Sequence, residues 1–154
     1  MDRMLLALAR RHAPSARTAI AVLGMALAVQ TDPAESKEHA RMWMTVDARR
    51  IAVKLDDSAT VRALVQLLPV TLNMAELNGN EKHAKLPRRL PAAAERVGTI
   101  RCGDVLLYGD DTLVVFYETF RSGYSYTRIG RIEETAGLGA VLGSGSRRVT
   151  FSMP

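Results

Sequence analysis

The sequence predicts a mainly β protein, a closed β-barrel of about seven or eight short strands with two short helices. Three observations lead to this fold class. From Met42 onward, apolar and polar residues alternate with the period of two that a half-buried strand requires. Helical spacing occurs in only two short stretches. The last alternating segment, ending at Met153, is able to pair near the first, and such pairing would remove the exposed edges of the sheet.

The composition is that of one globular domain. The chain has 154 residues, 47% of them hydrophobic and 24% charged, which suits a single packed core. Its net charge is +5, but four arginines and one aspartate before Gln30 account for +3 of this charge and leave +2 for the rest. The pairs Arg88-Arg89 and Arg147-Arg148 lack interleaved aromatic residues that could stack on bases. We therefore predict no nucleic-acid partner.

The N-terminal segment resembles a secretory leader. Basic residues up to Arg17 precede an apolar run, Ala19 to Val29, which contains the small-x-small pattern that signal peptidases cleave. Residues 1–30 are therefore predicted to be a signal peptide or a disordered leader. The run of about eleven residues is too short to cross about 30 Å of hydrocarbon at ~1.5 Å per residue, so no stable membrane span is expected.

Two locations stay open for the chain. One is export to the periplasm or the medium. The other is the cytoplasm, with the N-terminal segment forming a weak amphipathic helix that Pro14 interrupts. The following stretch, Thr31 to His39, is polar and without apolar periodicity, so residues 31–41 are predicted to be a linker. The folded domain would then cover residues 42–154.

The first elements of the domain are a hairpin and a helix. Alternation over Met42–Val46 and Ile51–Leu55, with a turn at Asp47-Ala48, predicts two antiparallel strands. Ser58 follows two aspartates and can cap a helix whose apolar face recurs at helical spacing until Pro69 ends it.

The middle of the domain is predicted to be less regular. Val70–Met74 is a brief strand, and Asn78-Gly79 favours a tight turn after it. Prolines and a run of alanines over Pro87–Ala94 predict a surface excursion, followed by short extended pieces such as Gly98–Ile100. These loops are where a site would most naturally lie.

The strongest strand signals come last. Val105–Tyr108 and Thr112–Tyr117 flank a turn, and the apolar run in the second segment predicts a strand that is covered on both faces. Tyr124–Ile132 alternates as a further strand. Leu138–Leu142 predicts a second short helix, and Val149–Met153 alternates as the closing strand.

Several blocks of the chain resemble the bacterial cyclophilin-like domain family. The likeness covers about Met42 to Phe151 in register. The blocks that carry it are LLPVTLNMAELNGNEKHAKLP (Leu67–Pro87), IRCGDVLLYGDDTLVVFYETF (Ile100–Phe120), SYTRIGRI (Ser125–Ile132) and LGSGSRRVTF (Leu142–Phe151). The resemblance implies a closed β-barrel with two helices, as the alternation does independently.

The resemblance does not carry a catalytic site with it. True cyclophilin peptidyl-prolyl isomerases place an arginine near a phenylalanine and a glutamine, in a segment resembling F-x-Q-G-G-D, and this sequence has no such segment. Arg121 and Arg128 are the arginines beside aromatic residues, and neither sits in that context. No catalytic residue is therefore assigned, and the question of enzymatic activity stays open.

Two groups of side chains are candidate ligand-binding residues. Asn73, Asn78, Asn80 and Glu81 crowd amide and carboxylate groups around a turn, where they could bind a peptide backbone or a small polar ligand. The alternative is that they stabilise the turn by local hydrogen bonds.

The second group is Tyr124, Tyr126 and Arg128, which alternate on one strand and so share one face. Two tyrosines and a guanidinium could hold an extended peptide or an aromatic ligand. The alternative is a barrel exterior, or a core tyrosine whose hydroxyl is satisfied. His83 is expected to face solvent and the lone Cys102 to act as a small apolar residue, so no metal site and no cofactor are predicted.

The sequence therefore predicts a binding module for an extended peptide or small ligand, without efficient catalysis. The alternative is a peptidyl-prolyl cis-trans isomerase with a non-standard site, because isomerisation needs little more than a desolvated groove and a donor to the proline nitrogen. A third alternative is an accessory domain for a separately encoded partner. The oligomeric state is not predicted.

Overall fold

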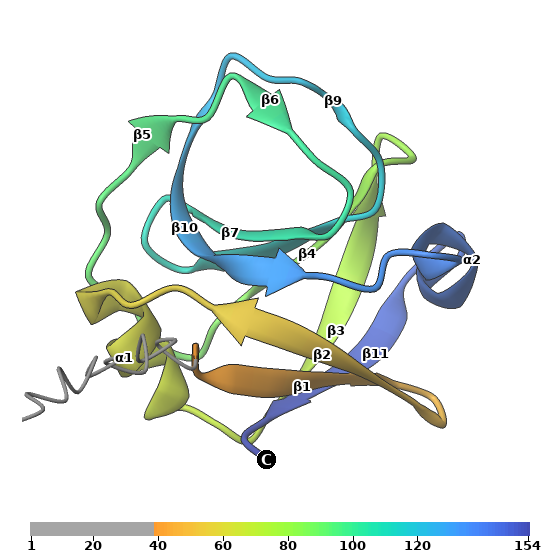
Figure 1. Ribbon diagram of the computed structural model, residues 1–154, viewed down its shortest axis with the longest axis horizontal. Coiled ribbons are helices and arrows are strands. Elements are labelled where there is room, and N and C mark those ends of the chain that lie inside the picture. The colour runs from red at the N-terminus through yellow and green to blue at the C-terminus, as the bar shows by residue number, and fades with distance from the viewer. Residues whose placement is uncertain (1–38) are drawn as a thin grey trace, which may run out of the picture. The chain divides into compact units, whose positions relative to one another are not determined.

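A computed structural model describes residues 39–154, which form a closed antiparallel β-barrel (Figure 1). The barrel has eight strands in the order β2-β1-β11-β3-β4-β8-β7-β10, and β10 pairs back onto β2. The predicted leader and most of the predicted linker lie outside the described residues. Within residues 39–154, neither helix has the length and apolar character that crossing a membrane would need.

The eight barrel strands are β1 (Arg41–Val46), β2 (Arg49–Leu55), β3 (Val70–Leu77), β4 (Glu81–Lys85), β7 (Asp104–Tyr108), β8 (Thr112–Phe116), β10 (Ser125–Ile132) and β11 (Arg147–Ser152). The other elements are α1 (Ala59–Val65), β5 (Glu95–Arg96), β6 (Thr99–Ile100), β9 (Phe120–Arg121) and α2 (Leu138–Leu142). Of the three short strands, β5 pairs with β10, while β6 and β9 pair with each other. The predicted class, mainly β with two short helices, is confirmed.

The two ends of the domain meet as the alternation predicted. The closing strand β11 pairs antiparallel with β1, with Val46 opposite Val149. The first hairpin has its turn at Asp47, which adopts a positive φ of 52°. Ser58 caps α1, since its hydroxyl accepts a hydrogen bond of 3.1 Å from the Val61 amide. The turn and the helix cap therefore correctly predicted the first hairpin and α1.

Two apolar clusters lie on opposite faces of β7 and β8. The larger one fills the barrel and includes Val105, Leu107, Leu113 and Val115. The smaller one lies on the outer face and consists of Ile100, Leu106, Val114, Phe116 and Tyr126, with Val97 and Phe120 packed against it. Because adjacent residues of a strand point to opposite faces, the apolar run of β8 is buried on both sides, as its sequence predicted.

Strand β4 was not predicted. Its sequence, EKHAK, contains no large apolar residue, so it lacks the alternation that marks the other strands. The structure pairs it with β3 on one side and β8 on the other. Its inward-facing Lys82 is fully buried and donates to the Gly143 and Gly145 carbonyls at 2.7 and 2.6 Å, and also to the Glu76 carboxylate. A buried lysine with its three donors satisfied thus occupies an inward-facing position that barrel strands usually fill with an apolar residue.

Candidate ligand-binding groove

A groove of about 880 Å³ lies on the outside of the barrel, over the outer faces of β3, β4, β8, β7 and β10. Its wall is the segment Phe120–Tyr124, which precedes β10. The register of the strands determines which side chains line the floor. Outward residues of β4 are Glu81, His83 and Lys85, at every second position. The groove thus follows a sheet surface whose opposite face is the barrel core.

Each outward residue of β4 has defined cross-strand neighbours. Glu81 is paired with Leu77 on β3 and with Phe116 on β8. His83 is likewise paired with Ala75 and Val114. Leu77 lines the floor beside Glu81, while Phe116 is fully buried beneath it.

Aromatic rings line the side of the groove formed by β7 and β10. Tyr108 lies 6.2 Å from Tyr124 and 5.7 Å from Tyr126, measured between ring centroids. The Phe116 ring contacts the Tyr126 ring edge to face at 5.7 Å, and it contacts the Phe120 ring in a tilted arrangement at 5.8 Å. Edge-to-face and tilted contacts of this kind hold rings in fixed orientations. Tyr124 and Tyr108 are nevertheless 65% and 49% exposed, so their faces remain accessible.

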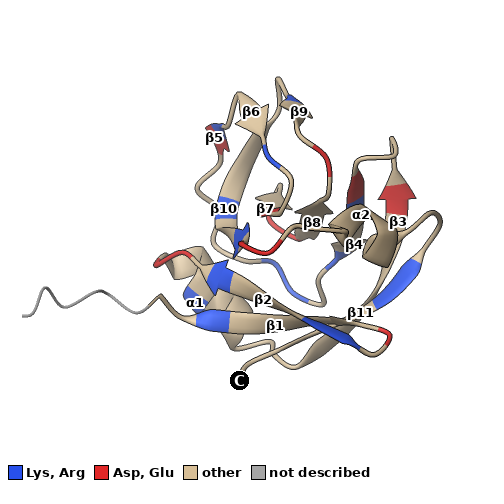
Figure 2. Ribbon diagram, turned by 45° about the vertical axis from the view of Figure 1, so that its right-hand side comes forward, with Lys and Arg blue, Asp and Glu red and all other residues tan. Residues whose placement is uncertain are grey.

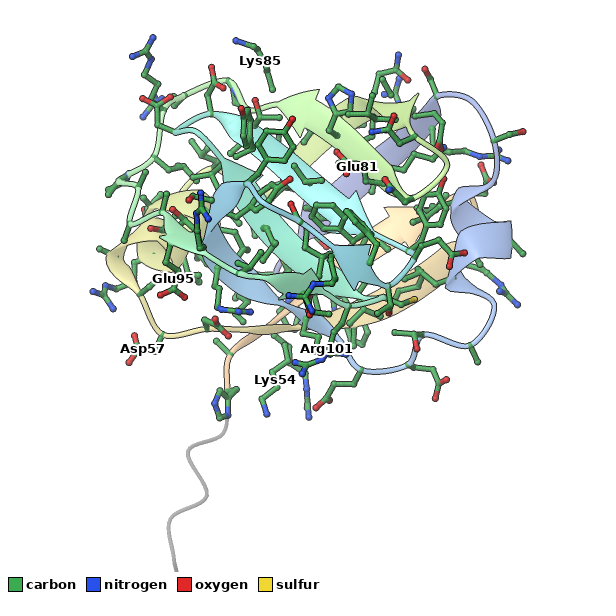
Figure 3. All side chains as sticks on the ribbon, turned by 90° about the horizontal axis from the view of Figure 1, so that it is seen from above. Lys54, Asp57, Glu81, Lys85, Glu95 and Arg101 are labelled. Atoms are coloured by element: carbon green, nitrogen blue, oxygen red, sulfur yellow. The ribbon has the colours of Figure 1, made fainter. Side chains whose placement is uncertain are left out.

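Glu81 is the buried charge of the groove. The residue is only 8% exposed, whereas Lys85, on the same strand, projects from the upper margin of the molecule in Figure 3. Burial raises the pKa of the Glu81 carboxyl, and the nearby Glu76 carboxylate raises it further. Within residues 39–154, no hydrogen bond or ion pair engages the Glu81 carboxylate.

The neighbouring cation cannot neutralise Glu81, because it points to the opposite face. All three Lys82 donors are used by Glu76, Gly143 and Gly145. Glu76 also accepts a hydrogen bond from the Tyr117 hydroxyl. Burial works to raise the pKa of Glu76, but the hydrogen bonds from Lys82 and Tyr117 outweigh it and leave that pKa below its ordinary value. The acidic residues at the end of β3 and the start of β4 are visible as red segments in Figure 2.

Five of the seven predicted site residues line this one groove. They come from the two separate predicted groups: Asn73, Asn78 and Glu81 from the first, and Tyr124 and Tyr126 from the second. The pairing of β4 with β8 places β3 and β4 beside β8, β7 and β10, and so joins the two groups. Neither the amides nor the tyrosines could be placed together from their spacing in the sequence.

Asn80 and Arg128 lie outside the groove. The Asn80 side-chain oxygen is buried in the β3–β4 turn and finds no partner within the described residues. Arg128 shares the outer face of β10 with Tyr126, but β5 pairs with the edge of β10 at that point and its Glu95 approaches Arg128 at 3.4 Å. The Arg128 guanidinium is thus paired with a residue of β5 and does not line the groove.

Several lining residues were not among the predicted site residues. They are His83, Lys85, Tyr108, Phe120 and Arg121. His83, expected to face solvent, is half-buried in the groove. If residues 81–85 had been predicted to form a strand, Glu81, His83 and Lys85 would have been placed on one face. These groove residues were missed because β4 was not predicted. Among residues 39–154, no group of three metal-ligating side chains is found.

Fold and groove together define the class: a small closed antiparallel barrel with a candidate binding groove on its outer surface. Residues 44–152 match the Cyclophilin-like family, and the chain belongs to that family. No curated protein matches the chain significantly. The solution structure of a hypothetical protein from Archaeoglobus fulgidus superimposes with a TM-score of 0.54 at 18% sequence identity, covering 79% of this chain and 99% of that one. At this identity the likeness concerns the fold alone.

Proposed function

We propose that the protein is a binding module whose groove holds an extended peptide or a small organic ligand. The observation that carries the proposal is a buried carboxylate, Glu81, facing an open groove whose other side is lined by accessible tyrosines. Pockets that bind organic ligands are mostly apolar and contain a few placed polar groups. This groove has that composition.

The dimensions of the groove favour an extended chain. Glu81 and Lys85 lie four residues apart on β4, which corresponds to about 13 Å at ~3.3 Å per residue. The Asn73 and Asn78 side chains add amide donors and acceptors that match those of a peptide backbone. The exposed ring of Tyr124 offers a surface for an apolar side chain or an aromatic ligand.

Binding can be tested with the full chain and two variants. Acetylated heptapeptide mixtures, nucleotides and flavins are screened by thermal shift and confirmed by NMR titration. Tyr124→Ala removes an exposed groove side chain, so affinity should fall about fivefold or more without loss of stability, as expected for a truncated aromatic contact. Arg128→Ala, outside the groove, is the matched control. A ligand bound equally well by both variants would place the site elsewhere.

One observation supports isomerase activity as a second candidate function. Arg121 follows Phe120 and lines the groove, so a guanidinium donor lies beside an aromatic ring where a proline nitrogen could be approached. The barrier to rotation about an X-Pro bond is near 20 kcal/mol. A protease-coupled assay with proline peptides tests this candidate: acceleration above buffer that Arg121→Ala removes and Arg128→Ala retains would support it. No acceleration by the wild-type chain would reject it.

A further inference from the structure

We infer that the groove recognises a basic side chain, lysine or arginine, of an extended peptide, with the cationic group paired to Glu81. This inference rests on the proposed function and deepens it by naming the chemistry of the ligand. The observation behind it is that the negative charge of Glu81 has no partner among the described residues. Glu81 is more than nine-tenths buried, and within the described residues no protein cation or hydrogen-bond donor engages its carboxylate.

The Glu81 oxygens are not among the fully buried atoms without a partner, so they reach solvent through the groove. Because the rest of the residue is buried, its charge is less well solvated than on an open surface, and a cation that enters the groove would stabilise the charged form.

None of the cations described near Glu81 is paired with it. Lys82 is committed to the barrel interior, and Lys85 is paired at 3.1 Å with Asp111 at the far end of β4. Arg121 and His83 also line the groove, but within the described residues neither engages the Glu81 carboxylate. The other near charge is Glu76, which is also negative. The potential at this end of the groove therefore favours a positive ligand.

The surroundings of Glu81 fit the stem of a long basic side chain. Its cross-strand neighbours are Leu77, which is 43% exposed, and Phe116, which is fully buried beneath the groove. Phe120 and Tyr126 pack against Phe116, and together with Leu77 they line the groove. Methylene groups of lysine or arginine can lie on such surfaces while the head group reaches a carboxylate, and aromatic rings add cation–π attraction.

A peptide is a better occupant than a free amine because of the rest of the groove. The groove of about 880 Å³ extends well beyond the surroundings of Glu81, and a small amine would leave most of it unfilled. Asn73, Asn78 and Tyr124 lie within the same groove and offer contacts to backbone amides and to a second side chain. An extended chain uses all of these groups at once.

The test is a positional-scanning library of acetylated, amidated heptapeptides, applied to the full chain. At the position with the strongest preference, lysine is then compared with Nε-acetyl-lysine and norleucine, which keep the stem and remove the charge. We expect lysine or arginine to be selected. Loss of the charge should weaken binding about ten- to hundredfold, the range of one charge-assisted hydrogen bond. Glu81→Gln should abolish the difference between lysine and norleucine, and Glu95→Gln should preserve it.

Each other outcome overturns a defined part of the inference. Peptides that bind in the groove without a basic preference, or with a preference that Glu81→Gln leaves intact, refute the pairing with Glu81 while the binding module stands. If n-butylamine alone binds as tightly as the selected peptide, the ligand is a free amine and the peptide assignment is wrong. If no peptide, nucleotide or flavin binds at all, the proposed function itself fails.

Discussion

Glu81 and Lys82 show how two adjacent charged residues can be buried with opposite consequences. Lys82 lies on the inner face of β4 and has a carboxylate and two carbonyls within reach of its ammonium group. Glu81 lies on the outer face, and no described residue engages its carboxylate. Successive residues of a strand face opposite sides. Lys82 therefore stabilises the interior of the barrel, while the Glu81 carboxylate is available to a ligand. This contrast makes the stability effects of the two residues predictable.

We predict that Glu81→Gln and Glu76→Gln change stability in opposite directions at neutral pH. The pKa of Glu81 is raised from its ordinary value of 4.5, chiefly by burial, so its charged form weakens the fold. The pKa of Glu76 is lowered, because its hydrogen bonds with Lys82 and Tyr117 outweigh burial, so its charged form strengthens the fold. Glu81→Gln should therefore raise the free energy of unfolding at pH 7, and Glu76→Gln should lower it.

The pH dependence follows from the same signs. The wild-type chain loses the contribution of Glu81 as pH rises from below 4.5 through its raised pKa, and loses that of Glu76 as pH falls through its lowered pKa. The advantage of Glu81→Gln should thus shrink as pH falls through the raised pKa of Glu81 toward 4.5, and the deficit of Glu76→Gln should shrink as pH falls below 4.5. Urea unfolding of the three proteins across this range measures both trends. A Glu81→Gln variant that is less stable than wild type at pH 7 would contradict the assignment.

A second prediction concerns Lys82. Replacing it with methionine keeps an unbranched side chain, one heavy atom shorter, but leaves the Glu76 carboxylate and two glycine carbonyls without their donor. Breaking one side of a buried ion pair typically costs about 3–5 kcal/mol, and we expect a loss of that size in urea unfolding. The control is Lys54→Met, since Lys54 is partly exposed and only 3.9 Å from an exposed Glu133. That variant should change stability by about 0.5 kcal/mol or less.

At the residue scale, the sequence supplied the chemistry of the site but not its geometry. The Asn73, Asn78 and Glu81 cluster and the two tyrosines were recognisable by residue type, and they do line one groove. Arg128 lies on the predicted outer face of β10 but is paired with Glu95 of β5, a strand far from it in the sequence, and does not line the groove. Burial of Lys82 could not be foreseen, because its partners on β3 and beside α2 are six or more residues away.

At the scale of elements, the strength of local signals decided what could be predicted. The first hairpin, α1 and the hairpin of β7 and β8 each carry alternation, a cap or a turn within a few residues. Strand β4 carries none of these, because its outward face is the polar floor of the groove and its inward face includes Lys82. The one missed barrel strand is therefore the strand that supplies the groove with Glu81.

The cap of α1 gives a prediction at this scale. Ser58 satisfies the Val61 amide at the start of a helix of seven residues. Ser58→Ala removes that acceptor and should lower the free energy of unfolding by about 1 kcal/mol. Ser144→Ala, at an exposed position between α2 and β11, is the matched control and should have little effect. Equal losses for the two variants in urea unfolding would mean that the cap contributes nothing particular.

At the scale of the whole molecule, the order of the strands in the sheet creates the groove. The outer faces of β3, β4, β8, β7 and β10 form one continuous surface because each of these strands is hydrogen-bonded to the next, and the closure onto β2 holds the far edge of β10. The sequence predicted a closed barrel from the match between its first and last strands, and β1 does pair with β11. It did not predict the second seam, between β2 and β10, because nothing local to either strand specifies that contact.

The seam between β2 and β10 depends on a glycine. Gly130 is paired with Leu55, and a Cβ atom at Gly130 would lie 2.1 Å from the Lys54 carbonyl oxygen and 3.1 Å from the Leu55 Cα. Both of these are backbone atoms, which cannot turn aside as a flexible side chain would. The requirement at this position is thus steric: the two strands approach too closely for any side chain on Gly130.

We therefore predict that Gly130→Ala opens or distorts the barrel. The clash should lower the free energy of unfolding by about 3 kcal/mol or more, at or above the upper end of ordinary overpacking, and hydrogen exchange should accelerate first at the amides of β2 and β10. Gly123→Ala is the control, since a Cβ there meets nothing within 4 Å. If Gly130→Ala matched that control in stability and exchange, β2 and β10 would not be held at the distance that closure requires. The groove would then have to be explained by an open sheet, whose β10 edge could move independently of β2.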